Sequence, residues 1–131
     1  MRLYLVRHAE AAPGHPDELR ALTRAGRERA RELGVQLARS GPEAVLSSPL
    51  LRARETAAAI AAAAGLSTEV DERLAPGATA EQVRAVVTGR GERVVVVAHQ
   101  PDCDEIAAEL SGRPAPPFAP GAVHAIDVDR A

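Results

Sequence analysis

Four consecutive valines, Val94 to Val97, constrain the fold of this chain more than any other feature. They belong to the run Arg93 to Ala98. An unbroken β-branched run of this kind is typical of a strand that is covered on both faces. Such strands lie inside parallel sheets, with helices packed on either side. The sequence therefore predicts an α/β fold with this segment as a central strand.

The rest of the chain alternates between strand and helix patterns. Strands are predicted at residues 2–6, 44–47, 68–70, 93–98 and 122–128, and helices at residues 23–40, 49–64, 80–87 and 101–110. For the second helix, Ser48 is the predicted N-cap and Pro49 the first helical residue. The alternation predicts a three-layer α/β/α sandwich with a mainly parallel central sheet. Because the chain is short and no linker divides it, we expect a single domain over residues 1–131.

Composition narrows the classes of partner. All 16 basic residues are arginine, and 18 acidic residues interspersed among them bring the formal net charge to −2. This balance argues against nucleic acid or an anionic membrane as the main partner. The single cysteine, Cys103, cannot form an internal disulfide, so no oxidising compartment is implied. No apolar stretch suits a signal peptide or a membrane span, and we expect a cytoplasmic protein.

Charged and nucleophilic side chains follow three of the predicted strands. Arg7 and His8 end the first strand, Arg52 lies in the first turn of the helix after the second, and His99 directly follows the valine run. Functional groups of open α/β sheets gather at the carboxyl ends of strands, where helix N-termini also meet. Since a helix N-terminus favours an anion, we expect these four side chains to surround one.

Two imidazole and two guanidinium groups suit phosphoryl transfer. A neutral imidazole attacks phosphorus without a separate base, and its usual pKa of about 6.5 keeps that form available at neutral pH. Arginines, with a second histidine that is protonated or donates a hydrogen bond, can compensate the charge on the phosphoryl oxygens. We therefore predict His8 as the nucleophile. The histidines show no metal-ligand spacing, and neither a metal nor another cofactor is expected.

Four motifs, in this order, resemble those of the histidine phosphatase superfamily. They are Leu5–Ala11 (LVRHAEA), Leu22–Gly26 (LTRAG), Ser47–Thr56 (SSPLLRARET) and Val96–Pro101 (VVAHQP). The short chain and the His-Gln-Pro after a strand resemble the small SixA-like phosphohistidine phosphatase branch. The resemblance spans residue 3 to about residue 101, and it implies the phosphoglycerate mutase-like fold without a cap domain.

Carried onto this sequence, the resemblance implies a role for each residue of the cluster. His8 is the histidine that becomes phosphorylated, Arg7 and Arg52 bind the phosphoryl group, and His99 is the second catalytic histidine. Arg20, just before the LTRAG motif, is a further candidate contact to phosphate or substrate. The superfamily usually has glycine where this chain has Ala9, and an alanine fits there only if the backbone avoids positive φ.

A second departure concerns the acid with which many superfamily members protonate the leaving group. The corresponding stretch is Asp71–Pro76, and Pro76 occupies the expected position of the acid. Glu10 and Glu72 remain alternative donors. An alkoxide leaving group depends on such an acid, whereas the imidazole of phosphohistidine can be protonated near neutral pH. The missing acid therefore favours a phosphoramidate substrate.

The length of the chain between Arg52 and His99 points to the same substrate. Once the predicted elements are subtracted, only a loop around residues 75–79 is left, which cannot form a lid over a small phosphometabolite. An uncovered site can receive a histidine on the surface of another protein. We therefore predict a phosphohistidine-bearing partner, of phosphorelay or phosphotransferase type, with phosphate as the product.

Two other functions stay open. One is a general small-molecule phosphomonoesterase on the same fold, and the other is a non-enzymatic phosphate-binding regulatory module. A histidine at a strand end is by itself more often structural than catalytic, and Arg52 could simply pair with Glu55 on an exposed helix face. The remaining polar side chains of interest are expected to be structural or exposed: His15, Arg54, His124, Asp127 and Asp129.

Overall fold

The structure is a computed structural model that describes residues 1–128, so the prediction for Asp129 lies outside the described residues. Its sheet contains five strands: β1 (Arg2–Arg7), β2 (Ala44–Ser47), β3 (Thr68–Val70), β4 (Arg93–Ala98) and β5 (Val123–Asp127). The strand order is β3-β2-β4-β1-β5. All neighbours are parallel except β5, which is antiparallel to β1. The valine run therefore forms the middle strand, as predicted.

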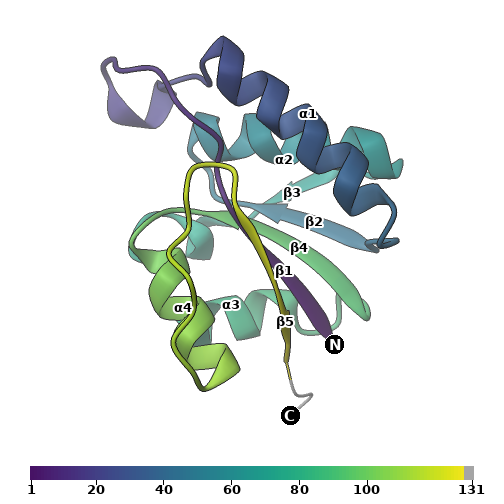
Figure 1. Cartoon of the computed structure of the whole chain (residues 1–131). Coiled ribbons are helices and arrows are strands. Elements are labelled where there is room, and N and C mark those ends of the chain that lie inside the picture. Colours follow the sequence, from purple (N-terminus) through teal and green to yellow (C-terminus); the bar gives the residue numbers. More distant parts are fainter. Residues whose placement is uncertain (129–131) are drawn as a thin grey trace.

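Helices cover both faces of this sheet (Figure 1). One layer consists of α1 (Arg24–Ala38) and α2 (Leu51–Ala64), and the other of α3 (Ala80–Val87) and α4 (Asp102–Ser111). Val95 and Val97 pack toward α1 and α2, whereas Val94 and Val96 pack toward α3 and α4. Alternation along one strand thus supplies both halves of the core. The predicted three-layer α/β/α sandwich is confirmed.

The connection between Arg52 and His99 is short, as expected. Apart from the rest of α2 and the start of β4, it contains β3, the 3-10 helix η2 (Glu72–Leu74) and α3. The loop after η2 lies against α4, because the backbone N–H of Gly77 donates to Asp102 Oδ2 at 2.7 Å. Asp102 is itself buried. This loop is therefore held down on the body of the protein.

Two segments differ from the prediction. Between the predicted strand at residues 2–6 and the predicted helix at residues 23–40, the structure has a 3-10 helix, η1 (Asp17–Leu19). The second difference is the start of α2, which begins at Leu51 with Leu50 as its N-cap residue, so Ser48 is not the N-cap. Ser48 Oγ instead accepts a hydrogen bond from the N–H of Leu50 and contacts His99, while Leu50 itself has an extended backbone. No helix within residues 1–128 is long and apolar enough to cross a membrane.

Close backbone contacts bring the segment after His8 onto α1. A side chain on Gly26 would overlap the carbonyl oxygen of Glu10, so the glycine of the LTRAG motif permits this approach. Thr23 caps α1, since its Oγ1 accepts a hydrogen bond from the N–H of Gly26 at 3.0 Å. The motif therefore fixes the path that the chain takes as it leaves the end of β1.

Candidate active site

The two predicted catalytic histidines lie side by side at the carboxyl end of the sheet. His8 directly follows β1 and His99 directly follows β4, and these neighbouring parallel strands pair Arg7 with Ala98. The N–H of His8 donates to the carbonyl of Ala98 at 3.1 Å, which continues this pairing. The ring centroids of His8 and His99 are 5.2 Å apart, with the ring planes tilted by 58°. Adjacent strands therefore bring together two residues that are far apart in the sequence.

The ring of His8 is oriented by its own neighbour. Its Nδ1 lies 2.8 Å from the carbonyl oxygen of Ala9, and since a carbonyl only accepts hydrogen bonds, Nδ1 carries the proton. The lone pair of the neutral ring is then on Nε2. Partial burial, followed by the charges of Arg52 and Arg7, lowers the pKa of His8 against the opposing effect of the Ala9 carbonyl. His8 is therefore neutral at neutral pH, with the lone pair that the predicted attack requires on Nε2.

The backbone at Ala9 tolerates its side chain. No residue other than glycine has positive φ within residues 1–128, so the alanine in place of the usual glycine is not strained. Ala9 is fully buried, and its N–H donates to Thr56 Oγ1 of α2 at 3.0 Å. Thr56 thus anchors the turn that carries His8, which explains why the last residue of the SSPLLRARET motif matters to the site.

His99 is held neutral by burial. Only 3 % of its surface is exposed, and its Nε2 lies 2.7 Å from Ser48 Oγ. Burial, assisted by the charges of His8 and Arg52, lowers the pKa of His99 to about 3. The sequence left open whether His99 is protonated, and its low pKa indicates the neutral ring at neutral pH.

Arg52 points into the same region from the first turn of α2 and is 7 % exposed. Its Nη1 donates to the carbonyl of Asp17 at 2.8 Å and its Nη2 to Asp17 Oδ2 at 3.1 Å. The alternative of a pair with Glu55 on the helix surface is wrong. Glu55 instead accepts a hydrogen bond from the N–H of Leu22 at 2.8 Å, since α2 faces the LTRAG segment there.

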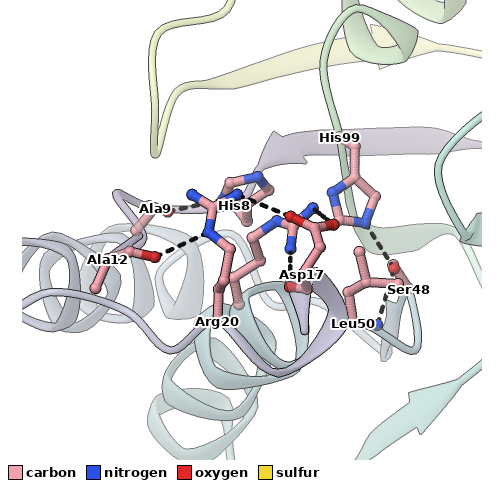
Figure 2. A network of polar contacts seen from close by, with 9 residues as sticks. His8, Ala9, Ala12, Asp17, Arg20, Ser48, Leu50 and His99 are labelled. Carbon is pink, nitrogen blue, oxygen red and sulfur yellow. Dashed lines mark hydrogen bonds and ion pairs between the residues drawn. The ribbon is translucent and has the colours of Figure 1, made fainter. Parts of the chain in front are cut away.

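Asp17 is a member of this cluster that the sequence did not reveal. Its Oδ1 accepts from Arg20 Nη1 at 3.0 Å, so the carboxylate bridges Arg20 and Arg52 (Figure 2). Hydrogen bonds from these two arginines lower the pKa of Asp17, although 59 % of its side chain is exposed. Arg20 is further held by the carbonyl of Ala12 at 2.8 Å. The predicted contact Arg20 therefore lies beside the cluster, linked to it through Asp17.

Two buried polar atoms of the cluster have no hydrogen-bond partner. They are Arg7 Nε and His99 Nδ1, and no other buried side-chain nitrogen or oxygen of residues 1–128 is left unpaired. Arg7 is held in place by another of its nitrogens, Nη1, which donates to the carbonyl of Phe118 at 3.0 Å. Unpaired buried polar atoms are costly and rare, and Arg7 Nε, which is always a donor, calls for an acceptor that binds there. A tetrahedral oxyanion offers several acceptor oxygens to such donors.

Both candidate proton donors, Glu10 and Glu72, are exposed. Glu10 Oε1 accepts from Thr23 Oγ1 at 2.8 Å, which ties its carboxylate to the start of α1. Glu72 is exposed on η2, and Pro76 is exposed in the loop that follows. The role of either glutamate as a donor stays a prediction.

The remaining candidates are structural or exposed, as expected. His15 is exposed, Arg54 donates to the carbonyl of Pro49, and His124 stacks on Phe118 at a centroid distance of 3.9 Å. Asp127 forms an exposed ion pair with Arg2. Burial raises the pKa of Cys103, so its thiol is inert. Within the described part of the chain, no three His, Cys, Asp or Glu side chains are grouped to hold a metal ion.

Comparison with solved structures shows that the fold is shared with known proteins. The chain is similar to the solved structure of "the protein histidine phosphatase SixA complexed with tungstate", with 30 % identity, a TM-score of 0.88, and coverage of 98 % of this chain and 89 % of that one. A candidate phosphohistidine phosphatase SixA from Agrobacterium tumefaciens is 29 % identical, with a TM-score of 0.73 and coverage of 85 % and 77 %.

Sequence comparison adds a relative and a family. An uncharacterised protein of Picosynechococcus sp. is 36 % identical, over 85 % of this chain and 73 % of its own. The family description that matches residues 3–76 is "Histidine phosphatase superfamily (branch 1)". This matched segment contains His8 and Arg52 and makes up more than half of the chain. The protein therefore belongs to the histidine phosphatase superfamily.

Proposed function

We propose that this protein is a phosphohistidine phosphatase, which takes a phosphoryl group from a histidine of another protein through a covalent phosphohistidine at His8. The observation that carries the proposal is the pair of unpaired buried nitrogens, Arg7 Nε and His99 Nδ1, together with the ring of His8, which lies next to that of His99 and has its lone pair on Nε2. A similar SixA structure contains tungstate, a tetrahedral oxyanion of the same shape as phosphate. His8, His99, Arg7 and Arg52 are the proposed catalytic residues.

In the first step, Nε2 of His8 attacks phosphorus while the phosphorus–nitrogen bond of the substrate breaks. His8 keeps its Nδ1 proton on the carbonyl of Ala9, so the phosphorylated ring carries a positive charge. A substrate imidazole that is protonated before the step leaves as a neutral ring, and no further proton is needed. Arg7, Arg52 and a hydrogen bond from His99 compensate the charge on the transferred oxygens.

In the second step, water attacks phosphorus and the ring of His8 leaves. The ring is again neutral, with its proton on Nδ1, and both protons of the water remain on the dihydrogen phosphate that forms. The ring of a cationic phosphohistidine departs as a neutral imidazole, which is a good leaving group. Neither step therefore depends on a strong general acid. The proton balance thus fits a site in which Pro76 replaces the acid of other superfamily members.

The same balance disfavours a phosphate ester. An alkoxide has a conjugate acid many pKa units above neutrality, so its departure requires a proton from the protein. Neither Glu10, bonded to Thr23, nor the exposed Glu72 is hydrogen-bonded to either histidine. The short connection before β4 also favours a bulky substrate, because its loop lies against α4 through Asp102. These features support a histidine presented by a partner of phosphorelay or phosphotransferase type.

Competing substrates test this proposal. We expect a carrier protein phosphorylated on histidine to be hydrolysed with a kcat/KM at least about 100-fold above that for an alkyl phosphate ester such as glycerol 3-phosphate, the size of effect that a missing general acid produces. The His8→Asn variant provides the background rate for both substrates. Equal turnover of the two would indicate a general phosphomonoesterase, and phosphate binding without turnover of either would indicate a regulatory module.

A further inference from the structure

Ser48 is a buried hydroxyl in the candidate site for which the reaction above has no use. It follows β2, and its N–H donates to the carbonyl of Val97 at 3.1 Å, so the paired strands β2 and β4 place it next to His99. Its side chain is completely buried, and its Oγ lies 2.7 Å from His99 Nε2. In Figure 2 this contact is on the side of the His99 ring that points away from His8.

The hydrogen atoms around Ser48 can be assigned from its contacts. A serine hydroxyl has one hydrogen and accepts through its oxygen. The N–H of Leu50 donates to Ser48 Oγ at 3.2 Å, so the oxygen already acts as an acceptor. Among the described residues, His99 Nε2 is the one contact of this hydroxyl that can receive its hydrogen. The hydroxyl hydrogen therefore has a partner only if Nε2 carries no proton.

The two neutral tautomers of His99 differ in what they leave unpaired. With the proton on Nε2, the Ser48 hydroxyl hydrogen is buried without an acceptor, and the unpartnered Nδ1 presents a lone pair that repels an anion. With the proton on Nδ1, the hydroxyl hydrogen is paired, and only one buried donor, Nδ1–H, is left over. A phosphoryl oxygen satisfies that donor. The cost of an unpaired buried polar group favours the second tautomer.

We propose that Ser48 is a positioning residue for His99: its hydroxyl donates to Nε2 and thereby keeps the ring proton on Nδ1, where it serves the phosphoryl group. The service to the phosphoryl group rests on the proposed function, whereas the tautomer of His99 does not. A neutral donor of fixed direction results, since Ser48 orients the ring as well as the proton. This role is analogous to partners that fix metal-bound histidines through their second nitrogen.

The ring nitrogens of His99 provide a test that needs no substrate. In a protein labelled with 15N in its histidines, long-range 1H–15N spectra distinguish a protonated from an unprotonated ring nitrogen. At neutral pH we expect wild-type Nδ1 to be protonated and Nε2 to be unprotonated. We expect Ser48→Ala to lose this preference and Ser48→Thr to keep it. A wild-type ring protonated on Nε2, or an unchanged tautomer in Ser48→Ala, would overturn the proposal.

A neighbouring serine supplies the matched control. Ser47 is equally buried, but its Oγ donates to the carbonyl of Ser48 and does not contact His99. Ser47→Ala should leave the tautomer as in the wild type, and a lost preference in this variant would mean that any buried hydroxyl at this turn acts on His99. The wild-type spectrum alone decides the tautomer if Ser48→Ala does not fold.

Kinetics test whether the tautomer serves the reaction. We expect Ser48→Ala to lower kcat for a phosphohistidine protein by about 10- to 100-fold, with a smaller change in KM, and Ser48→Thr to restore most of it. If the tautomer is as expected but no phosphorylated substrate is turned over by the wild type, the proposed function fails while the assignment of Ser48 stands. Turnover by the wild type that is unchanged in Ser48→Ala would contradict the catalytic half of the inference.

Discussion

The carboxyl end and the amino end of the sheet differ in how their arginines are paired. At the amino end, exposed Arg93 donates to the carbonyl of Gly41 and pairs with Glu43, and exposed Arg2 pairs with Asp127. At the carboxyl end, Arg7 keeps a buried Nε without a partner, and His99 keeps Nδ1 in the same state. Exposed ion pairs such as those at the amino end contribute little to the free energy of unfolding. Buried nitrogens without a partner, as at the carboxyl end, favour a site that binds a ligand.

A cavity of about 580 Å³ lies at the amino end, where α3 leads into β4, and its lining includes Met1, Arg84 and Thr88. Neither histidine of the candidate site lines it. The proposed site is thus marked by unpaired buried polar atoms and not by this cavity, because an anion on a protein surface needs donors more than it needs enclosure.

The largest expected effect is a difference in kcat between substitutions of two histidines, His8 after β1 and His124 in the neighbouring strand β5. We expect His8→Asn to lower kcat by about 1,000-fold or more, as loss of a nucleophile does. His124→Asn should retain at least half of the wild-type kcat, because His124 of β5 stacks on Phe118 and does not contact the cluster. Turnover of a phosphohistidine protein measures both. Comparable losses in the two variants would show that the fold rather than the nucleophile had been damaged.

A pair of arginine substitutions compares the two ends directly. Arg7→Lys keeps the charge but removes the unpaired Nε, and we expect kcat/KM to fall by about 100-fold, as for the loss of one oriented donor to the transition state. Arg93→Lys at the amino end should change kcat/KM by less than about twofold, because its pair is exposed. If Arg7→Lys is as active as the wild type, the orphaned donor has no part in catalysis.

Stability should depend on pH through the buried histidine. In the unfolded chain His99 binds a proton below about pH 6.5, whereas in the folded protein its pKa is about 3. The contribution of neutral His99 to the free energy of unfolding is therefore fully present above pH 6.5. It is lost as the pH falls toward 3, by about 1.4 kcal/mol per pH unit.

Urea unfolding between pH 7 and pH 4 measures this dependence. His99→Gln should flatten the slope of the free energy of unfolding against pH by about that amount per unit, and His8, whose pKa is also lowered, should account for part of what remains. Identical slopes in wild type and His99→Gln would contradict a neutral, buried His99.

The smallest expected effect concerns Asp17, whose carboxylate accepts hydrogen bonds from Arg20 and Arg52. In Asp17→Asn, inorganic phosphate should inhibit turnover more strongly, with an inhibition constant about two- to fivefold lower, because an exposed charge that repels the anion is removed. Asp127→Asn, which removes a carboxylate paired with Arg2 at the amino end, should not alter inhibition. Weaker inhibition in Asp17→Asn would show instead that Asp17 organises the arginines for phosphate.

The sheet and the cluster could be predicted because they follow from short patterns. Val94 to Val97 require a strand covered on both faces, and the carboxyl ends of parallel strands meet at one edge, so residues directly after strands come together. His8, Arg52 and His99 were found in this way. The same reasoning placed Arg52 in the first turn of α2 even though the helix begins two residues later than predicted.

Asp17, Ser48 and the charge of His99 depend on contacts that no local pattern encodes. Asp17 reaches Arg52 across 35 positions through the path of a loop. A serine followed by proline before a helix normally predicts an N-cap. Here the Ser48 hydroxyl contacts the imidazole of His99, which directly follows β4. The low pKa of His99 is a result of burial, which the order of residues alone does not reveal.

The covalent intermediate tests the central claim most directly. The wild-type protein is mixed with a protein phosphorylated on histidine and quenched in alkali within milliseconds, and the phosphate is located by mass spectrometry and 31P NMR. We predict an acid-labile phosphate on Nε2 of His8 that disappears as inorganic phosphate is released. Turnover without any phosphate on His8, or with the phosphate on His99, would contradict the account.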